Sequence, residues 1–279
     1  MIRLGQYNTL RISRFTDYGA YLTDDDEKHP EEILLPGRYI TDEMVVGDTV
    51  DVFVYKDSED RPVAVTEKPF ITVGEFAYLQ VLQVNKFGAF LDWGLPKNLL
   101  CPFSEQKVRM NPGGIYLVYA YLDKETQRIV ASAKVNKFLD NVYPEYTPGQ
   151  EVSALVTGRN DIGYQVIVDN RHRGMIYSNE IYRPLEVEET IKAYVKHIRE
   201  DGRLDLTLTA PGTLDRISKT GERIMEMLEA GTFSLTDNSS PEDIKNVLQC
   251  SKKDFKKAVG ALYRAHRITI TPEGIIYPA

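Results

Sequence analysis

Phe87-Gly88-Ala89-Phe90-Leu91-Asp92 is the stretch that decides the fold of this chain, because its pattern recurs at a regular interval. A similar stretch, Tyr18-Gly19-Ala20-Tyr21, lies earlier, and a weaker one, Gly163-Tyr164-Gln165-Val166, lies later. Gly19 precedes Gly88 by 69 residues, and Gly163 follows it by 75. Each of these glycines follows another by fourteen residues, and the three earlier ones are Gly5, Gly74 and Gly149. A period of about 70 residues is too long for a solenoid repeat and indicates a small domain used three times.

Strand patterns surround each repeat, with alternating β-branched and aromatic residues between turn residues. In the second unit the five predicted strands are 76–84, 87–92, 98–102, 114–121 and 128–134. Five short strands in about 70 residues are typical of the partly open Greek-key OB barrel. No Asn-Gly or Asp-Gly pair separates the first two strands, so Asn85-Lys86 is expected to form their turn.

Gly88 lies inside a strand pattern, where glycine permits a bulge, a tight bend or the close approach of another backbone. Phe87 and Phe90 are three residues apart and would face opposite sides of a regular strand. A bulge at the glycine would bring both rings to one surface.

The formal net charge of −7 is unevenly distributed. Residues 1–70 carry 8 basic and 15 acidic side chains, a difference of −7, so the remainder is neutral overall. Strong nonspecific binding to phosphates needs a positive field, so the composition argues against it. The acidic run Asp24-Asp25-Asp26-Glu27 is predicted to be a solvated loop rather than a divalent-ion site.

Other features of the composition favour a cytoplasmic binding protein. Hydrophobic residues make up 42% of the 279 residues, and the N-terminus lacks the apolar stretch of a secretory signal. No apolar run approaches the ~18 residues of a membrane span. Cys101 and Cys250 fall in different predicted domains and are expected to be reduced thiols.

No residue pattern points to catalysis. The four histidines are scattered, no His/Cys spacing suggests zinc, and no glycine-rich loop suggests nucleotide binding. A catalytic triad assembled by folding stays open at this point. We expect no enzyme activity, no metal and no cofactor.

The second unit resembles the S1-type RNA-binding domain, through Phe87-Gly88-Ala89-Phe90-Leu91-Asp92 and Leu100-Cys101-Pro102-Phe103-Ser104-Glu105. The first unit is similar, and the third is degenerate because Ile162 and Gln165 replace both aromatics. In that family two aromatics and a histidine form a patch on which RNA bases stack.

The resemblance implies a set of RNA-binding residues. The stacking rings would be Tyr18, Tyr21, Phe87 and Phe90. Pro36, Pro102 and Tyr177 occupy the histidine position, and only Tyr177 can still stack. The basic residue of the last strand would be Arg61, Arg128 or Arg203 in the three units. Alternatively, the rings belong to the core or bind a protein partner.

The third unit has one local basic cluster, Arg171-His172-Arg173, which is expected at a solvated turn.

After residue 212 the pattern becomes helical. A first helix is predicted over 213–229 with a stop at Gly231, a second begins at Ser240-Pro241, and a third runs from Ser251 to about His266. Residues 267–277 form a predicted hairpin with a Pro-Glu-Gly turn. Three helices and a hairpin are the winged-helix pattern, a relative of helix-turn-helix modules.

The third helix carries four lysines away from its apolar face: Lys252, Lys253, Lys256 and Lys257. Lysines supply phosphate contacts rather than base specificity. They could contact RNA, dock a protein, bind duplex DNA in the major groove, or form a solvated face.

The predicted fold is mainly β with an α C-terminal domain: three tandem five-stranded S1-like OB barrels and a winged helix. The expected boundaries are 1–69, 70–145, 146–211 and 212–279. This domain order resembles the bacterial conserved virulence factor B family, which implies RNA binding linked to post-transcriptional control of gene expression. We expect single-stranded RNA rather than duplex DNA or a membrane as the ligand. The alternatives are a scaffold that recruits the ribosome or an RNA-processing protein such as a nuclease, and a DNA-binding regulator.

Overall fold

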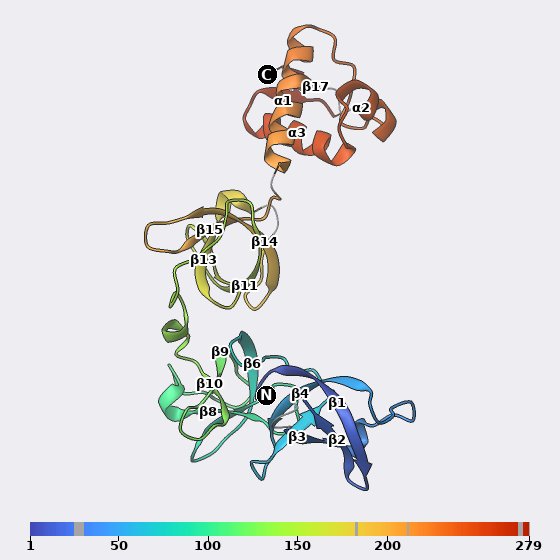
Figure 1. The fold of residues 1–279 in the computed structure, drawn as a ribbon. Coiled ribbons are helices and arrows are strands. Elements are labelled where there is room, and N and C mark those ends of the chain that lie inside the picture. Colours follow the sequence, from blue (N-terminus) through green and yellow to red (C-terminus); the bar gives the residue numbers. More distant parts are fainter. Residues whose placement is uncertain (25–30, 182–183, 211, 273–275, 279) are drawn as a thin grey trace.

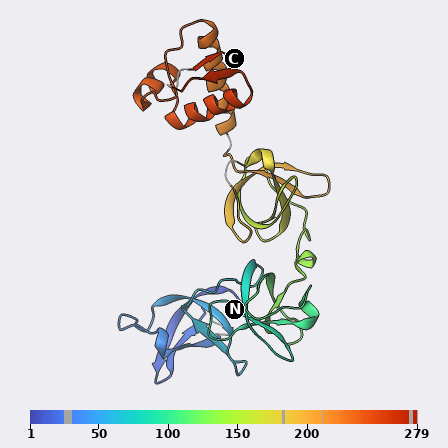
Figure 2. The ribbon, with the colours of Figure 1, turned by 180° about the vertical axis from the view of Figure 1, so that it is seen from behind.

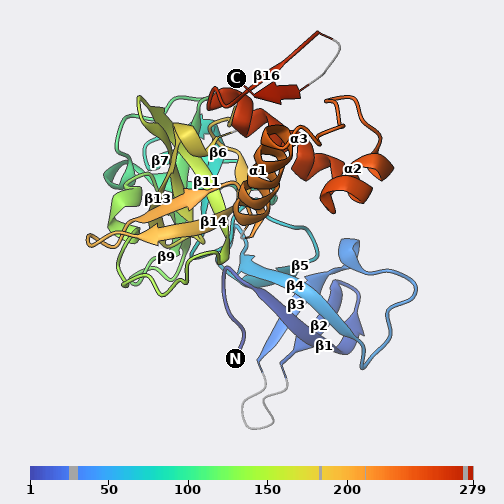
Figure 3. The ribbon, with the colours of Figure 1, turned by 90° about the horizontal axis from the view of Figure 1, so that it is seen from above.

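The computed structural model describes residues 1–24, 31–181, 184–210, 212–272 and 276–278. It contains three closed five-stranded barrels followed by a helical C-terminal domain, which confirms the predicted fold class. Barrel 3 lies between the first two barrels and the C-terminal domain (Figures 1 and 2). Seen from above, barrel 1 projects to one side of barrels 2 and 3 (Figure 3).

The three barrels share one strand order, in which the third strand runs parallel to the fifth. Barrel 1 comprises β1 (Tyr7–Thr16), β2 (Gly19–Thr23), β3 (Glu32–Pro36), β4 (Thr49–Lys56) and β5 (Pro62–Val65). Barrel 2 comprises β6 (Phe76–Val84), β7 (Gly88–Leu91), β8 (Leu99–Pro102), β9 (Ile115–Leu122) and β10 (Ile129–Ser132). Barrel 3 comprises β11 (Glu151–Asn160), β12 (Gly163–Val168), β13 (His172–Tyr177), β14 (Thr190–Ile198) and β15 (Leu204–Thr207).

Short 3-10 helices η1 (Gly37–Tyr39), η2 (Phe103–Glu105) and η4 (Ser178–Glu180) follow the third strand of each barrel, and η3 (Val135–Phe138) lies between barrels 2 and 3. The expected domain boundaries all fall between strands or helices, and as domain limits they stay a prediction.

The repeated glycines permit the close approach of two strands. A Cβ built on Gly88, whose φ is +155°, would lie 2.3 Å from the carbonyl oxygen of Cys101 on β8. The equivalent distances are 2.1 Å at both Gly19 and Gly163. Any larger residue would therefore push the second strand of the barrel away from the third.

Of the roles that the sequence left open for the glycine, close backbone approach is the one found, and the bulge lies instead on the neighbouring strand. In barrel 2 the pairing shifts between Val81 and Gln83, so that Leu82 is the extra residue opposite β7. The same shift occurs in barrels 1 and 3. A bulge on the longer first strand bends it around the barrel, while the glycine on the second strand keeps its ladder.

Adjacent barrels pack through apolar residues. Phe53 and Tyr55 of barrel 1 meet the buried ring of Trp93 edge-on, with centroids 5.8 and 6.0 Å apart. Barrels 2 and 3 share a second cluster built on Phe76, Leu139, Leu155 and Ile167. Barrel 2 is therefore held on both sides.

The C-terminal domain consists of α1 (Thr213–Glu229), α2 (Pro241–Leu248), α3 (Lys252–Arg264) and the pair β16 (Ile268–Ile270) and β17 (Ile276–Pro278). The predicted N-caps are confirmed, since Ser240 and Ser251 accept hydrogen bonds from the backbone N–H three residues later. The hairpin is also found, although the Glu-Gly part of its turn lies outside the described residues.

Two other sequence expectations concern the cysteines and the acidic run. Cys101 lies in the core of barrel 2, where burial raises the pKa of its thiol to about 11, and Cys250 is half-buried. Residues 25–27 of the acidic run lie outside the described residues. Among the described helices, none is both long enough and apolar enough to span a membrane.

Candidate nucleic-acid interface

A polar side chain at the end of the first strand shapes the turn that presents the first aromatic ring. Asn85 Oδ1 accepts a hydrogen bond of 2.8 Å from the N–H of Phe87, and Asn160 Oδ1 accepts one of 3.1 Å from Ile162. Thr16 Oγ1 makes the corresponding contact of 3.4 Å with the N–H of Tyr18. These side chains replace a backbone turn and direct the next-but-one residue outward.

The rings beside the glycines are open to solvent rather than part of the barrel cores. Tyr18 is 79% exposed and Phe87 is 61% exposed, while Tyr21 and Phe90 are half-buried. Tyr21 pairs with Arg14 across the bulge of barrel 1, and its ring lies 4.1 Å from the Arg14 guanidinium carbon. Each of the first two barrels therefore offers one exposed ring and one half-buried ring, and Lys86 Nζ lies 5.1 Å from the centroid of the Phe87 ring.

Barrel 2 joins its rings to a hollow of about 450 Å³ between barrels 1 and 2. Phe87, Phe90 and Arg128 line this hollow, as the sequence predicted for one site. Gln83, Trp93 and Lys97 also line it, together with residues of barrel 1 such as Lys56. Among the described residues that line the hollow, three are cationic and none is a carboxylate. We call this the barrel 2 face.

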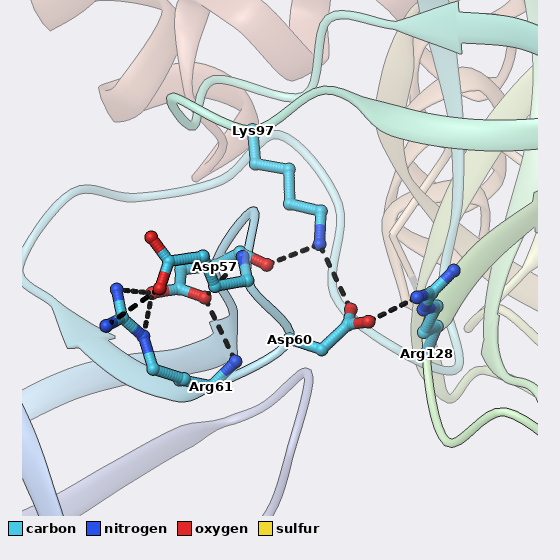
Figure 4. A network of polar contacts seen from close by, with 6 residues as sticks. Asp57, Asp60, Arg61, Lys97 and Arg128 are labelled. Carbon is cyan, nitrogen blue, oxygen red and sulfur yellow. Dashed lines mark hydrogen bonds and ion pairs between the residues drawn. The ribbon is translucent and has the colours of Figure 1, made fainter.

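The β4–β5 loop of barrel 1 places the carboxylate of Asp60 beside two of these cations (Figure 4). Asp60 forms an ion pair with Arg128, and its other oxygen lies 3.6 Å from Lys97 Nζ. Lys97 also donates a hydrogen bond of 2.6 Å to the backbone oxygen of Asp57. The hydrogen bond from Arg128 lowers the pKa of Asp60, so this carboxylate is charged at neutral pH.

Arg61, the counterpart of Arg128 in barrel 1, belongs to the same loop but is directed to its own barrel. Its guanidinium forms ion pairs with Asp57 at 2.8 Å and with Glu59 at 3.0 Å. Arg61, Arg128 and Arg203 all lie one residue before the last strand, not within it as expected. Of the three, only Arg128 lines the barrel 2 face.

Barrel 3 differs from the other two in its exposed side chains. Gln165 pairs with Gly158 just as Phe90 pairs with Gln83, and Ile162 is 55% exposed at the position of Phe87. Tyr177 is half-buried and accepts a hydrogen bond of 2.8 Å from Arg199, so its hydroxyl is already engaged. The stacking arrangement is therefore not repeated there.

Of the Arg171-His172-Arg173 cluster, only Arg171 lies at an exposed turn as expected, because β13 begins at His172. His172 is 3% exposed with its ring edge-on to Tyr146, and burial lowers its pKa. Arg173 lies on β13, with Nε 3.3 Å from Asp140 Oδ2. Period-2 alternation assigns His172 to the buried side of β13, a signal that was available in the sequence.

The four lysines of α3 lie apart from its core residues. Lys253, Lys256 and Lys257 are exposed and Lys252 is half-buried, whereas Phe255, Ala258, Val259 and Leu262 are buried. Lys256 is engaged by Asp237 at 2.6 Å. The other three make no ion pair with any described residue.

The sequence missed the residues that barrel 1 contributes to the barrel 2 face. Asp60 and Arg128 are 68 residues apart, and no local pattern signals their pairing. The sequence could have assigned Trp93 to this face, since it is the only tryptophan of the chain and lies three residues after Phe90. Among the described residues, no group of three or more His, Cys, Asp or Glu side chains could hold a metal ion.

Comparisons with known proteins agree with this architecture at both ends of the chain. A family model described as S1 domain matches residues 4–67, and one described as CvfB-like winged helix domain matches residues 222–276. Neither describes a catalytic domain. S1 domains are OB-type barrels and winged helices are related to helix-turn-helix modules, so both belong to classes that bind nucleic acids.

Relatives align over most of the chain. A protein of Bacillus subtilis (strain 168) named YitL is 27% identical over 278 residues, which cover 96% of this chain and 91% of that protein. Conserved virulence factor B of Staphylococcus aureus (strain USA300) is 26% identical over 238 residues, which cover 82% of this chain and 79% of that protein.

Among solved structures, a multidomain protein with nucleic acid binding domains from Streptococcus pneumoniae is 24% identical. The match covers 99% of this chain and 98% of that chain, with a TM-score of 0.40. The S1 domain, the CvfB-like winged helix and the relatives along most of the sequence agree with one another. The chain therefore combines an S1 domain with a CvfB-like winged helix and is similar to conserved virulence factor B proteins over most of its length.

Proposed function

We propose that this protein binds single-stranded RNA on barrels 1 and 2 and acts in post-transcriptional regulation of gene expression. The observation that carries the proposal is the pair of rings beside each glycine strand. In barrel 2, Phe87 is 61% exposed and adjoins Phe90 in a hollow lined by three cations, of which Asp60 engages Lys97 and Arg128 from outside the lining. Such a surface supplies both parts of a single-strand site, a stacking platform and a positive groove.

The expected affinity is modest for one barrel and larger for the array. Each base stacked on an aromatic ring contributes about 1–3 kcal/mol. Two linked barrels multiply modest affinities, because binding to the second becomes intramolecular. The net charge of −7 keeps the protein from holding RNA by charge alone, so stacking is expected to dominate.

The decisive experiment replaces both rings of barrel 2. The Phe87→Ala/Phe90→Ala variant is expected to weaken binding of a labelled single-stranded RNA by about 5- to 150-fold, which corresponds to the loss of one stacked base. Fluorescence anisotropy measures the affinity, and circular dichroism checks the fold. Tyr143→Ala is the matched control, because this ring is 69% exposed in the connection between barrels 2 and 3 and does not line the barrel 2 face. Equal affinities of the double variant and the control would refute the stacking role.

The winged helix is proposed to extend or orient the RNA. Lys252, Lys253 and Lys257 make no ion pair with any described residue, so they are available to phosphates. A competition between single-stranded RNA and duplex DNA tests this. If duplex DNA displaces the labelled RNA more strongly than unlabelled single-stranded RNA does, the result would instead support a DNA-binding regulator. An affinity for RNA that does not fall as the salt concentration rises would support a protein scaffold.

A further inference from the structure

A second hollow, of about 560 Å³, opens between barrels 2 and 3. Barrels 2 and 3 are held against each other on either side of this hollow, because hydrogen bonds join them as well as their shared apolar cluster. The N–H of Phe76 donates to Asn170 Oδ1 at 2.8 Å, and the Tyr78 hydroxyl donates to the backbone oxygen of Thr157 at 3.1 Å. We call this hollow the barrel 2–3 cleft.

One wall of the barrel 2–3 cleft is the surface of barrel 3 that corresponds to the proposed stacking surface of barrel 2. Ile162 and Gln165, which replace the two aromatic residues, both line it. Asn160 lines it too, and its Oδ1 accepts hydrogen bonds of 3.1 Å from the N–H groups of both Ile162 and Gly163. The amide oxygen is thereby fixed, and the NH₂ group makes no hydrogen bond to a described residue. Amide groups of this kind read the polar edges of bases.

The charges of the cleft have one sign. Lys107, Arg173, Arg199 and Arg203 line it, and no described lining residue is a carboxylate. Such a grouping is unexpected on a chain with a net charge of −7. Arg199 has a structural role, because it is held by Asp205 at 2.6 Å and by the hydroxyl of Tyr177.

The other three cations retain donors for an anion. Lys107 is exposed and makes no ion pair with a described residue, and Arg203 is 50% exposed with its Nε 3.5 Å from Asp201. Arg173 forms an ion pair with Asp140 through its buried Nε and donates from Nη2 to the backbone oxygen of Asn136 at 3.4 Å, but its side chain is still 37% exposed. A guanidinium has five N–H donors, and Arg is the side chain best suited to phosphate.

We propose that the barrel 2–3 cleft binds a nucleotide of single-stranded RNA through its phosphate and the polar edge of its base, without stacking. The inference rests on the function proposed above and extends it to barrel 3. A free nucleotide has the same chemistry, but the strand is favoured because the cleft occupies the OB surface that stacks bases in the first two barrels. The amide and guanidinium groups replace stacking by hydrogen bonding, so this barrel is expected to prefer certain bases.

The test uses the full-length chain and two labelled RNAs, one of about 6 nucleotides that fits a single barrel and one of about 18 that reaches further. The Lys107→Ala/Arg203→Ala variant is expected to bind the long RNA several-fold more weakly. Its affinity for the short RNA, which binds at barrel 2, should not change. The slope of log affinity against log salt should fall by about 0.7 for each lost phosphate contact. Lys68→Ala/Lys245→Ala removes the same charge from exposed positions outside the cleft and is the matched control.

The outcomes separate this proposal from the previous one. If the cleft variant behaves like its control with the long RNA while Phe87→Ala/Phe90→Ala still weakens both RNAs, the cleft proposal is overturned and stacking stands. If the aromatic variant has no effect, the stacking proposal fails instead. Gln165→Glu provides an independent variant and should also weaken the long RNA, because it adds a carboxylate to the cleft. Displacement of the long RNA by micromolar nucleoside monophosphate in the wild type, but not in the cleft variant, would identify a free nucleotide as the occupant and overturn the strand proposal.

Discussion

Replacing Asp60 by asparagine should strengthen RNA binding at low salt, because this carboxylate engages two cations of the barrel 2 face. Asp60 pairs with Arg128 directly and lies 3.6 Å from Lys97 (Figure 4). A phosphate that approaches either cation must compete with this carboxylate. Lys97 stays tied to the backbone oxygen of Asp57 at 2.6 Å, so Arg128 is the group that the substitution mainly releases.

The size of the effect follows from counting charges. Each phosphate neutralised on a single strand adds about 0.7 to the slope of log affinity against log salt. One released arginine therefore steepens the slope by about 0.7, and the gain in affinity should be about 3-fold larger at 50 mM than at 200 mM salt. If Lys97 were released as well, the slope would change by about 1.4 and the ratio would be about 7-fold.

Fluorescence anisotropy at several salt concentrations measures both the affinity and the slope. Glu43→Gln is the matched control, because it removes one negative charge from an exposed position of barrel 1 that makes no ion pair with a described residue. A general change of net charge would affect both variants equally. Identical slopes for Asp60→Asn and Glu43→Gln would show that the carboxylate does not compete with RNA.

The remaining predictions concern stability. Gly88→Ala should destabilise barrel 2 by about 2–4 kcal/mol, because its Cβ would collide with the backbone of β8; urea unfolding followed by Trp93 fluorescence measures this, and an unchanged midpoint would contradict it. Gly260→Ala, where a Cβ meets nothing within 4 Å in the middle of α3, is the contrasting variant and should stabilise the C-terminal domain by about 1 kcal/mol. Burial lowers the pKa of His172 below its unfolded value of about 6.5, so the unfolded state binds more protons and the free energy of unfolding should fall as the pH drops below that value, by at most about 1.4 kcal/mol per pH unit. His172→Gln should reduce this dependence between pH 7.5 and 5, and an identical pH profile for both proteins would show that His172 does not cause it.

Local patterns in the sequence determined the elements of this fold. The strands of barrel 2 begin and end within one residue of their predicted limits, except that β10 ends at Ser132, two residues before its predicted end. The helix caps Ser240 and Ser251 are where the sequence placed them. Both results have the same cause, since strand alternation and N-cap hydrogen bonds depend on residues only a few positions apart. The glycine repeat was equally readable, because close backbone approach requires glycine wherever it occurs.

Only the tertiary structure decided which polar groups meet. Arg128 pairs with Asp60 in another barrel, and Arg173 joins the barrel 2–3 cleft. These features depend on how neighbouring repeats pack, and one repeat contains no local signal of the surface that its neighbour will present. The sequence therefore determined three barrels, the first two with exposed rings, while the charges around those rings were set by contacts between residues many positions apart.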